Sequence, residues 1–221
     1  MKIYTGQTSG DQLKKIISLG MGIMISSSPV ATPSKEIAKA YCALDNGAFT
    51  CYRKGYPFMK EVFLKTIQDA YKKNIPLDFI VTPDIIAKGM ESYLYSFHWA
   101  TIEPLKTAPN LALVVQDGIT PGSLGSVRRW SHIFVGGTVE WKWKTAKEWI
   151  DFAHSEGKKV HIGQCGKLEY LLMAYELGAD SVDSTSWTVN DSFHIVEKFY
   201  DQIGRQPERH QIYLFDEEAT A

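Results

Sequence analysis

The chain of 221 residues is 44% hydrophobic, and its 24 Lys and Arg residues nearly balance 25 Asp and Glu residues, for a formal net charge of −1. This suffices for one domain with one core, and the balanced charge gives no support to nucleic-acid binding through overall basic charge. Three cysteines without a CxxC pair indicate reduced thiols in a cytoplasmic protein, and we expect neither a signal peptide nor a membrane span.

Short apolar runs alternate with helical patterns from one end of the chain to the other. We expect eight strands, at residues 2–6, 21–26, 41–45, 79–82, 111–116, 132–135, 159–163 and 181–183. Apolar residues at helical spacing predict helices at residues 11–19, 57–73, 91–106, 145–156, 167–177 and 191–202. Thr145, with Glu148 three residues later, fits a capping box, and glycines at 20, 157 and 178 follow helices as C-caps do.

The regular alternation of eight strands with helices favours parallel strands joined by right-handed crossovers. We therefore predict an α/β protein, a single compact (β/α)8 barrel of the TIM type, over residues 1–204. The structural alternative is an open doubly wound sheet, which often carries a GxGxxG fingerprint that this sequence lacks. We expect residues 205–221 to form a C-terminal tail that is only partly ordered.

Polar side chains follow four of the predicted strands where the strands end. They are Asp45, Asp84, Gln116 and Asp183, and Gly136-Gly137 ends a fifth strand. Each has an ordinary structural reading: Asp45 fits an Asx-turn, Asp84 fits a helix N-cap, and the two glycines fit a plain turn. In a barrel, however, the C-terminal ends of all strands meet at one rim, where active sites form. The joint pattern therefore predicts a polar active site.

A metal site is the alternative at the end of the seventh predicted strand, where His161 and Cys165 stand close together. Their spacing fits no zinc motif. We therefore expect no metal and no cofactor.

The ordered set of strand-end motifs resembles that of the tRNA-guanine transglycosylase superfamily, whose (β/α)8 barrels exchange a guanine base for a 7-deazaguanine. Asp45-Asn-Gly-Ala-Phe49 is similar to the family's Asp-Ser-Gly-Gly-(Phe/Tyr) segment, and Val115-Gln-Asp-Gly118 to its Val-Gln-Gly-Gly segment. Gly136-Gly137-Thr138 is similar to Gly-Gly-Leu, Ile162-Gly-Gln-Cys165 to Met-Gly-Val-Gly, and Val182-Asp183 to a Phe-Asp at the last strand. Each motif is short, and the resemblance over residues 41–187 lies in their shared order.

The resemblance implies a role for each matching residue. Asp183 would be the nucleophile that forms a covalent glycosyl–enzyme intermediate, and Asp45 the general acid/base. Asp84 and Gln116, with backbone groups of Gly136 and Gly137, would bind the polar edge of the heterocycle. Phe49 and Ile162 would sandwich its ring.

The chain departs from the tRNA enzymes of this superfamily, because it has no cysteine cluster for their structural zinc subdomain and no additional RNA-binding domain. It resembles the compact DNA-modifying branch found in phages and bacterial genomic islands. This implies DNA and a free 7-deazaguanine base, such as 7-cyano-7-deazaguanine, as partners in the cytoplasm of the cell or phage host. Ala48 and Asp117 replace family glycines, which leaves the base specificity open.

A local nucleic-acid surface is expected where cations and flat rings alternate, at Arg128-Arg129-Trp130 and Trp141-Lys142-Trp143-Lys144. An ordinary amphipathic helix is the alternative. The target base must leave the duplex stack to react. Other functions fit the same residues: a tRNA transglycosylase, a barrel hydrolase or isomerase that uses Asp45 and Asp183, or a non-catalytic base-binding protein. A homodimer or association with partner proteins is compatible with the sequence.

Overall fold

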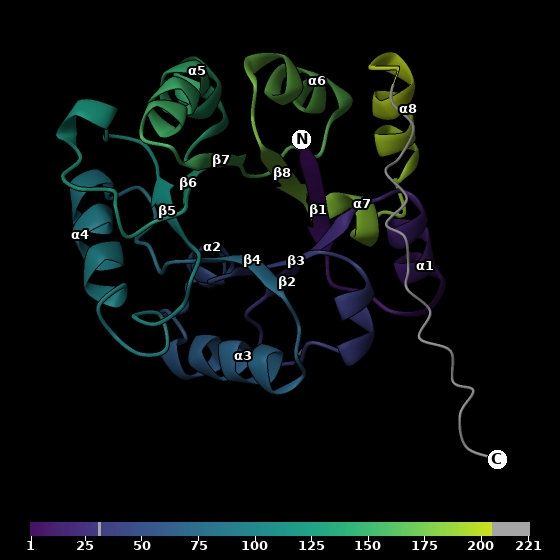
Figure 1. Ribbon diagram of the computed structural model, residues 1–221, viewed down its shortest axis with the longest axis horizontal. Coiled ribbons are helices and arrows are strands. Elements are labelled where there is room, and N and C mark those ends of the chain that lie inside the picture. The colour runs from purple at the N-terminus through teal and green to yellow at the C-terminus, as the bar shows by residue number, and fades with distance from the viewer. Residues whose placement is uncertain (31, 205–221) are drawn as a thin grey trace.

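Eight parallel strands close into a barrel in chain order, β1-β2-β3-β4-β5-β6-β7-β8, in the computed structural model, which describes residues 1–30 and 32–204 (Figure 1). The strands are β1 (Lys2–Gly6), β2 (Gly22–Ser26), β3 (Cys42–Asp45), β4 (Leu77–Val81), β5 (Leu111–Val115), β6 (His132–Val135), β7 (Lys159–Ile162) and β8 (Ser181–Ser184). The predicted (β/α)8 barrel is confirmed, and all eight strands lie within a few residues of the expected ranges. The expected tail at 205–221 lies outside the described residues.

Helices surround the barrel, except that the short helix α2 falls within the ring of strands in this view (Figure 1). They are α1 (Gly10–Ser18), α2 (Ala48–Arg53), α3 (Lys60–Lys72), α4 (Gly89–Trp99), α5 (Val139–Ser155), α6 (Leu168–Leu177), α7 (Ser186–Val189) and α8 (His194–Gln202). Two 3-10 helices, η1 (Lys35–Lys39) and η2 (Pro121–Ser123), stand in the connections that precede β3 and β6. The two short helices α2 and α7 follow β3 and β8 directly, and the sequence patterns did not predict them.

Strand side chains alternate between two buried clusters, as expected where helices cover a parallel sheet. The inner cluster fills the barrel with Tyr4, Met24, Ala43, Phe79, Val81, Ala112 and Val114. The outer cluster joins the other face of the strands to the helices. A residue's position in this alternation therefore decides whether its side chain faces the barrel interior or the helix layer.

A β-bulge in β4 interrupts the alternation. Cys42 pairs with Leu77 and Leu44 pairs with Ile80, so β4 has one residue more than β3 between these pairs. Phe79 packs in the inner cluster, and the preceding Asp78 accepts a hydrogen bond from the inward-facing Tyr4 hydroxyl at 2.5 Å. The extra residue thus places the Asp78 carboxylate at the N-terminal end of the barrel interior.

The start of α5 differs from the prediction. Thr138 is the N-cap and its hydroxyl accepts a hydrogen bond from the Trp141 amide, whereas Thr145 lies inside the helix and donates to the Trp141 carbonyl. The expected capping box at Thr145 is therefore wrong. A cap seven residues earlier is available because Gly137, with φ of 75°, ends the loop after β6.

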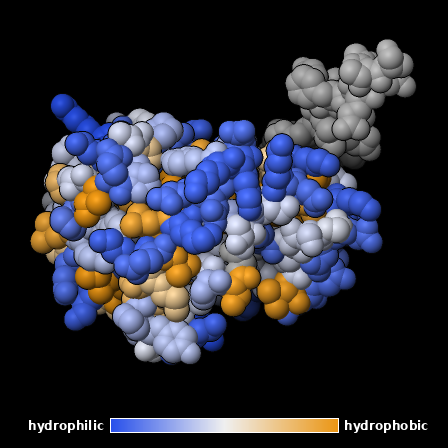
Figure 2. All heavy atoms as spheres, turned by 90° about the horizontal axis from the view of Figure 1, so that it is seen from below, coloured by the Kyte–Doolittle hydropathy of each residue, from blue (hydrophilic) through white to orange (hydrophobic). Residues whose placement is uncertain are grey.

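The face of the molecule that carries α3 is mainly hydrophilic (Figure 2). Figure 2 shows the face that carries α3, where hydrophobic residues form small separate groups among hydrophilic ones. Within the described part of the chain, no helix is both long enough and apolar enough to cross a bilayer.

Candidate active site

Three carboxyl groups stand together at the C-terminal end of the barrel, where the sequence predicted a polar rim. Asp45 is the last residue of β3, Asp183 lies in β8, and Asp84 follows β4. The three groups are close enough that the charges of Asp183 and Asp84 both raise the pKa of the Asp45 carboxyl group. The two predicted catalytic residues therefore share one end of the barrel.

Asp183 is held by two hydrogen bonds to one of its oxygens. Its Oδ1 accepts from the Gln164 backbone N–H at 3.2 Å and lies 3.1 Å from His161 Nε2. On the other side of the imidazole, Nδ1 lies 2.9 Å from the Ser181 hydroxyl. An Nε2–H of His161 that donates to Asp183, with Nδ1 held by the Ser181 hydroxyl, satisfies both ring nitrogens. The carboxylate is thereby oriented through Oδ1, while Oδ2 makes no hydrogen bond with the described residues.

His161 is a site residue that the sequence interpretation considered only as a metal ligand. It is fully buried and packs inside the barrel, with ring centroids 4.5 Å from Phe134 and 5.4 Å from Phe79. Alternation along β7 was the available signal, because the neighbouring Ile162 is the more apolar residue and faces the helices. The predicted sandwich role of Ile162 is accordingly wrong: its side chain lies in the outer cluster.

Asp45 holds its proton more tightly than an ordinary carboxyl group. Burial and then repulsion from Asp183 raise its pKa to about 7, against a hydrogen bond from the Gly47 amide at 3.0 Å. Gly47 has φ of 79°, and a Cβ there would stand 2.8 Å from the Ser27 carbonyl oxygen, so this turn needs glycine. Near neutral pH this carboxyl group can either give or take a proton.

Asp84 and Gln116 form a hydrogen bond with each other and are not both free to bind a ligand. Asp84 accepts from Asn46 Nδ2 at 2.9 Å and from Gln116 Nε2 at 3.1 Å, and burial raises its pKa to about 6. The Gln116 amide also donates to the Ile85 carbonyl at 2.9 Å, and its oxygen accepts from the Ala87 amide at 2.6 Å. Gln116 therefore fastens the loop after β4, and both ends of its amide are already engaged with protein groups.

The other predicted substrate-binding residues lie near the same end of the barrel. Phe49 is the second residue of α2 and is 43% exposed. Gly136 follows β6, and its N–H donates to the Val115 carbonyl at 2.9 Å. Gly137 leaves no room for a side chain, since a Cβ would stand 2.5 Å from an oxygen of Asp117. The Asp117 carboxylate in turn accepts from the Thr138 amide and hydroxyl at 2.8 and 2.7 Å.

The expected nucleic-acid contacts do not form one surface. Arg128 and Arg129 lie at the opposite, N-terminal end of the barrel, and the Arg129 guanidinium donates to main-chain carbonyls of residues 105, 106 and 108. Trp130 is buried. Both segments read as basic and aromatic in sequence, but tertiary packing uses most of these side chains inside the protein.

Lys142 also departs from the expectation of a surface cation. It is 2% exposed and donates to the Gly163 carbonyl at 2.5 Å, just after β7. Burial lowers its pKa, while the negative charges of Asp183 and Asp117 act in the other direction. Trp143 stacks on Tyr170 with ring centroids 5.2 Å apart. Of the predicted contacts in this segment, Lys144 is exposed.

Exposed aromatic side chains do occur on α2, the helix that follows Asp45, and on the turn after it. Tyr52 is 60% exposed and Tyr56 is 56% exposed, and the cations Arg53 and Lys54 lie between them in the chain. In Figure 1, which looks along the barrel, α2 falls within the ring of strands. The signal in the sequence was the aromatic and basic run Phe49–Tyr56 shortly after Asp45, of which only Phe49 was assigned a role.

No group of three or more His, Cys, Asp or Glu side chains among the described residues is arranged to hold a metal ion. Comparison with models of known protein families gives no match, and neither does comparison with curated proteins.

Proposed function

We propose that this barrel is a DNA-guanine transglycosylase, which replaces guanine with a 7-deazaguanine base through a covalent intermediate on Asp183. One observation carries the proposal: two carboxyl groups in different environments, Asp183 and Asp45, share the C-terminal end of the barrel. Two carboxyl groups in different environments can supply the nucleophile and the acid/base of one displacement.

In the first step, an Asp183 oxygen attacks the anomeric carbon of the target nucleotide. The bond from that carbon to the guanine nitrogen breaks, and its electron pair leaves with guanine, which takes a proton from the Asp45 carboxyl group. In the second step, Asp45 takes the proton from the incoming base, whose nitrogen attacks the same carbon and releases Asp183. Asp45 suits both transfers because its pKa is raised to about 7.

The nucleic acid lies across α2 in this proposal. Base–aromatic stacking and cationic side chains are the features of surfaces that hold single strands, and Tyr52, Arg53, Lys54 and Tyr56 provide both beside the carboxyl groups. A base that enters the barrel mouth must first leave its stack, which single-stranded DNA permits at the least cost. This surface takes the place of the one expected from Arg128, Arg129 and Lys142.

A hydrolase that cleaves the same glycosidic bond is the second candidate, and one observation favours it. Asp84 and Gln116, the expected anchors for the polar edge of an incoming base, are bonded to each other and to the loop after β4. With water as the acceptor no second base has to be recognised, and the Asp45 and Asp183 pair would be used unchanged.

The test is to incubate the protein with single-stranded DNA, duplex DNA or tRNA and labelled 7-cyano-7-deazaguanine. We expect label in DNA, a protein–DNA adduct at Asp183 by mass spectrometry, and a loss of roughly 10³-fold or more in Asp183→Asn and Asp45→Asn. Asp201→Asn, on the exposed side of α8, is the control. Label in tRNA alone overturns the DNA assignment, guanine release without incorporation supports the hydrolase, and neither product contradicts both functions.

A further inference from the structure

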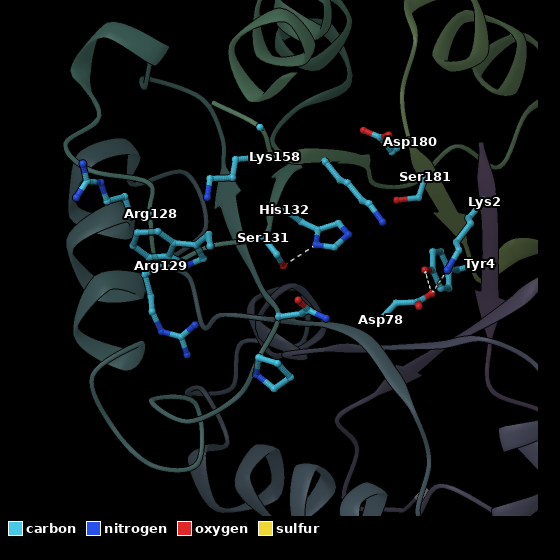
Figure 3. A pocket seen from close by; sticks show the side chains of 15 residues that line it. Lys2, Tyr4, Asp78, Arg128, Arg129, Ser131, His132, Lys158, Asp180 and Ser181 are labelled. Carbon is cyan, nitrogen blue, oxygen red and sulfur yellow. Dashed lines mark hydrogen bonds and ion pairs between the residues drawn. The ribbon is translucent and has the colours of Figure 1, made fainter. Parts of the chain in front are cut away.

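A second open site lies at the N-terminal end of the barrel. It is a pocket of ≈ 510 Å³ bounded by the starts of β1, β7 and β8 and by the segment that enters β6. Figure 3 shows side chains from these separate elements directed around one central space. The volume is within the usual range of about 300–1,000 Å³ for small-molecule sites.

Aromatic side chains separate this pocket from the carboxyl groups at the other end. Phe79 stands between two imidazoles, with ring centroids 4.5 Å from His132, which lines the pocket, and 5.4 Å from His161, which contacts Asp183. Tyr4 packs edge-on against Phe79 at 5.7 Å. The pocket is therefore a site of its own and not a continuation of the candidate active site.

The pocket carries an excess of positive charge in a protein whose net charge is −1. Five cationic side chains line it, Lys2, Arg128, Arg129, Lys158 and Lys159, against the two acidic side chains Asp78 and Asp180, an excess of three. Such a concentration of one sign in a concave site raises the local concentration of ligands of the opposite sign.

Both acids are already engaged by protein groups. Asp78 accepts from Lys2 Nζ at 2.6 Å and from the Tyr4 hydroxyl at 2.5 Å. Asp180 accepts from the Val160 amide at 2.8 Å and lies 2.9 Å from His154 Nε2. Neither carboxylate therefore neutralises the remaining cations.

Three of the cations have no such partner. The side chains of Arg128, Lys158 and Lys159 make no hydrogen bond or ion pair with any described residue, whereas Arg129 is fixed in the wall by its bonds to main-chain carbonyls. The site thus combines one fixed guanidinium with three cations that remain available to a ligand.

Neutral polar groups complete the wall. His132 is 7% exposed, and its Nδ1 lies 2.8 Å from the Ser131 hydroxyl. Its Nε2 has no hydrogen-bond partner among the residues that the structure describes, and in Figure 3 the ring points into the pocket. Burial, together with the charges of His161 and Lys159, lowers the pKa of His132 to about 4, so the excess positive charge comes from the Lys and Arg side chains.

We propose that this pocket binds a small phosphate-bearing molecule, with Arg128, Lys158 and Lys159 closing on the phosphate oxygens and Arg129 as the fixed cation of the wall. Guanidinium groups bind phosphate through paired hydrogen bonds, and ammonium groups contribute as point charges. The proposal is independent of base exchange at the other end of the barrel.

The probes are pyrophosphate, inorganic phosphate and guanosine monophosphate, titrated separately into the full chain by calorimetry. We expect saturable one-to-one binding of at least one probe, weakened at least about tenfold in the double variant Lys158→Gln/Lys159→Gln. The matched control is Lys39→Gln/Lys198→Gln, which removes the same charge from exposed lysines outside the pocket. Binding of guanosine monophosphate without binding of the inorganic anions identifies a nucleotide site, and the reverse identifies a site for the phosphate group alone.

Two results would overturn the proposal. One is the absence of saturable binding of all three probes. The other is an equal loss in the pocket variant and the control, which would assign binding to overall charge. A fourth titration uses an oligonucleotide without terminal phosphates: if it alone binds and depends on Lys158 and Lys159, the occupant is a polynucleotide and the small-molecule proposal fails.

Discussion

Asp45 and Asp183 stand at the same end of the barrel but in different surroundings. Asp183 is fixed by His161 and by the Gln164 amide, whereas Asp45 is partly buried and receives one hydrogen bond from Gly47. Different surroundings are what allow two chemically identical groups to take different parts in one reaction.

The raised pKa of Asp45 makes stability depend on pH. Its pKa is about 7 in the folded protein and about 3.9 in an unfolded chain, so the folded state holds the proton more tightly. The stabilisation from this proton is complete below about pH 4 and is lost as the pH rises through 7. We expect the free energy of unfolding of Asp45→Asn to exceed that of the native protein by roughly 1–3 kcal/mol at pH 8, and by little at pH 5.

Urea unfolding at the two pH values measures this difference. Asn at position 45 retains an oxygen for the Gly47 amide, so the comparison isolates the charge. Asp201→Asn is the control on an exposed helix surface. An equal effect of Asp45→Asn at pH 5 and pH 8 would contradict the assigned environment.

His161 is expected to position Asp183 rather than to react. His161→Phe keeps a ring of similar size beside Phe134 but removes the hydrogen bond to the carboxylate. A hydrogen bond to a charged group contributes about 1.5–3 kcal/mol, which corresponds to a fall of roughly ten- to a hundredfold in kcat. KM should change little, because the substrate contacts remain. A rise in KM with kcat unchanged would show that His161 does not act through Asp183.

Only part of the site could be predicted at the residue scale. Asp45 and Asp183 were found because a charged residue at the end of an apolar strand is conspicuous. The sequence interpretation gave a substrate-binding role to Ile162, whereas His161 is the residue that faces the barrel interior. An apolar side chain is the more usual choice for a buried position, so the pattern favoured Ile162. Lys142 was misplaced since no local pattern reveals that a lysine on an amphipathic helix will be buried against a neighbouring loop.

At the scale of elements, α2 is the main addition to what the sequence indicated. Its first residue follows Asp45 by only three positions, so the helix carries its exposed rings to the barrel end. Loss of two stacking rings should weaken binding. We expect Tyr52→Ala/Tyr56→Ala to bind single-stranded DNA at least about tenfold more weakly, by fluorescence anisotropy at fixed ionic strength.

The matched control for α2 is Tyr71→Ala/Tyr175→Ala. These two tyrosines are each 41% exposed and lie on α3 and α6. Equal weakening by both double variants would mean that the strand does not lie on α2.

The loop between β4 and α4 depends on a side chain from the next strand. Gln116 bonds the Ile85 carbonyl, the Ala87 amide and Asp84, and Ala87 has φ of 58°, an unfavourable value for alanine. We expect Gln116→Ala to lower the free energy of unfolding by about 2–4 kcal/mol, since buried polar groups lose their partners.

Hydrogen exchange gives the local readout for this loop. The Ala87 amide should exchange faster in Gln116→Ala than in the native protein. Its exchange rate should be unchanged in Gln68→Ala, a control on the exposed face of α3. Protection of Ala87 in both variants would show that the loop holds its conformation without Gln116.

At the scale of the whole molecule, the fold was the most predictable property. Eight apolar runs separated by helical patterns leave few arrangements once right-handed crossovers are required. The bulge in β4 and the pocket at the N-terminal end could not be predicted, because both depend on pairing between strands distant in sequence. Arg128 and Arg129 show the limit: their charge was evident, but not the end of the barrel on which they lie.

Phe79 packs against His132 at the N-terminal end of the barrel interior and against His161 at the C-terminal end. A substitution at Phe79 therefore tests whether the interior packing affects the candidate active site. Phe79→Leu should cost about 1–2 kcal/mol of stability. It should also lower activity, because Phe79 packs against His161. Phe63→Leu, an equally buried change in the outer cluster, should cost similar stability and leave activity unchanged. Equal activities of the two variants would show that the interior packing does not position Asp183.

The layer of rings across the middle of the barrel makes the molecule two-sided. Tyr4, Phe79 and His161 pack against one another in the barrel interior, between the N-terminal pocket and the candidate active site. A ligand of the candidate active site and a ligand of the N-terminal pocket would approach from opposite ends of the barrel, and neither would block the other. A polynucleotide draped over α2 would therefore leave the far basin open to solvent, and simultaneous occupancy is geometrically allowed.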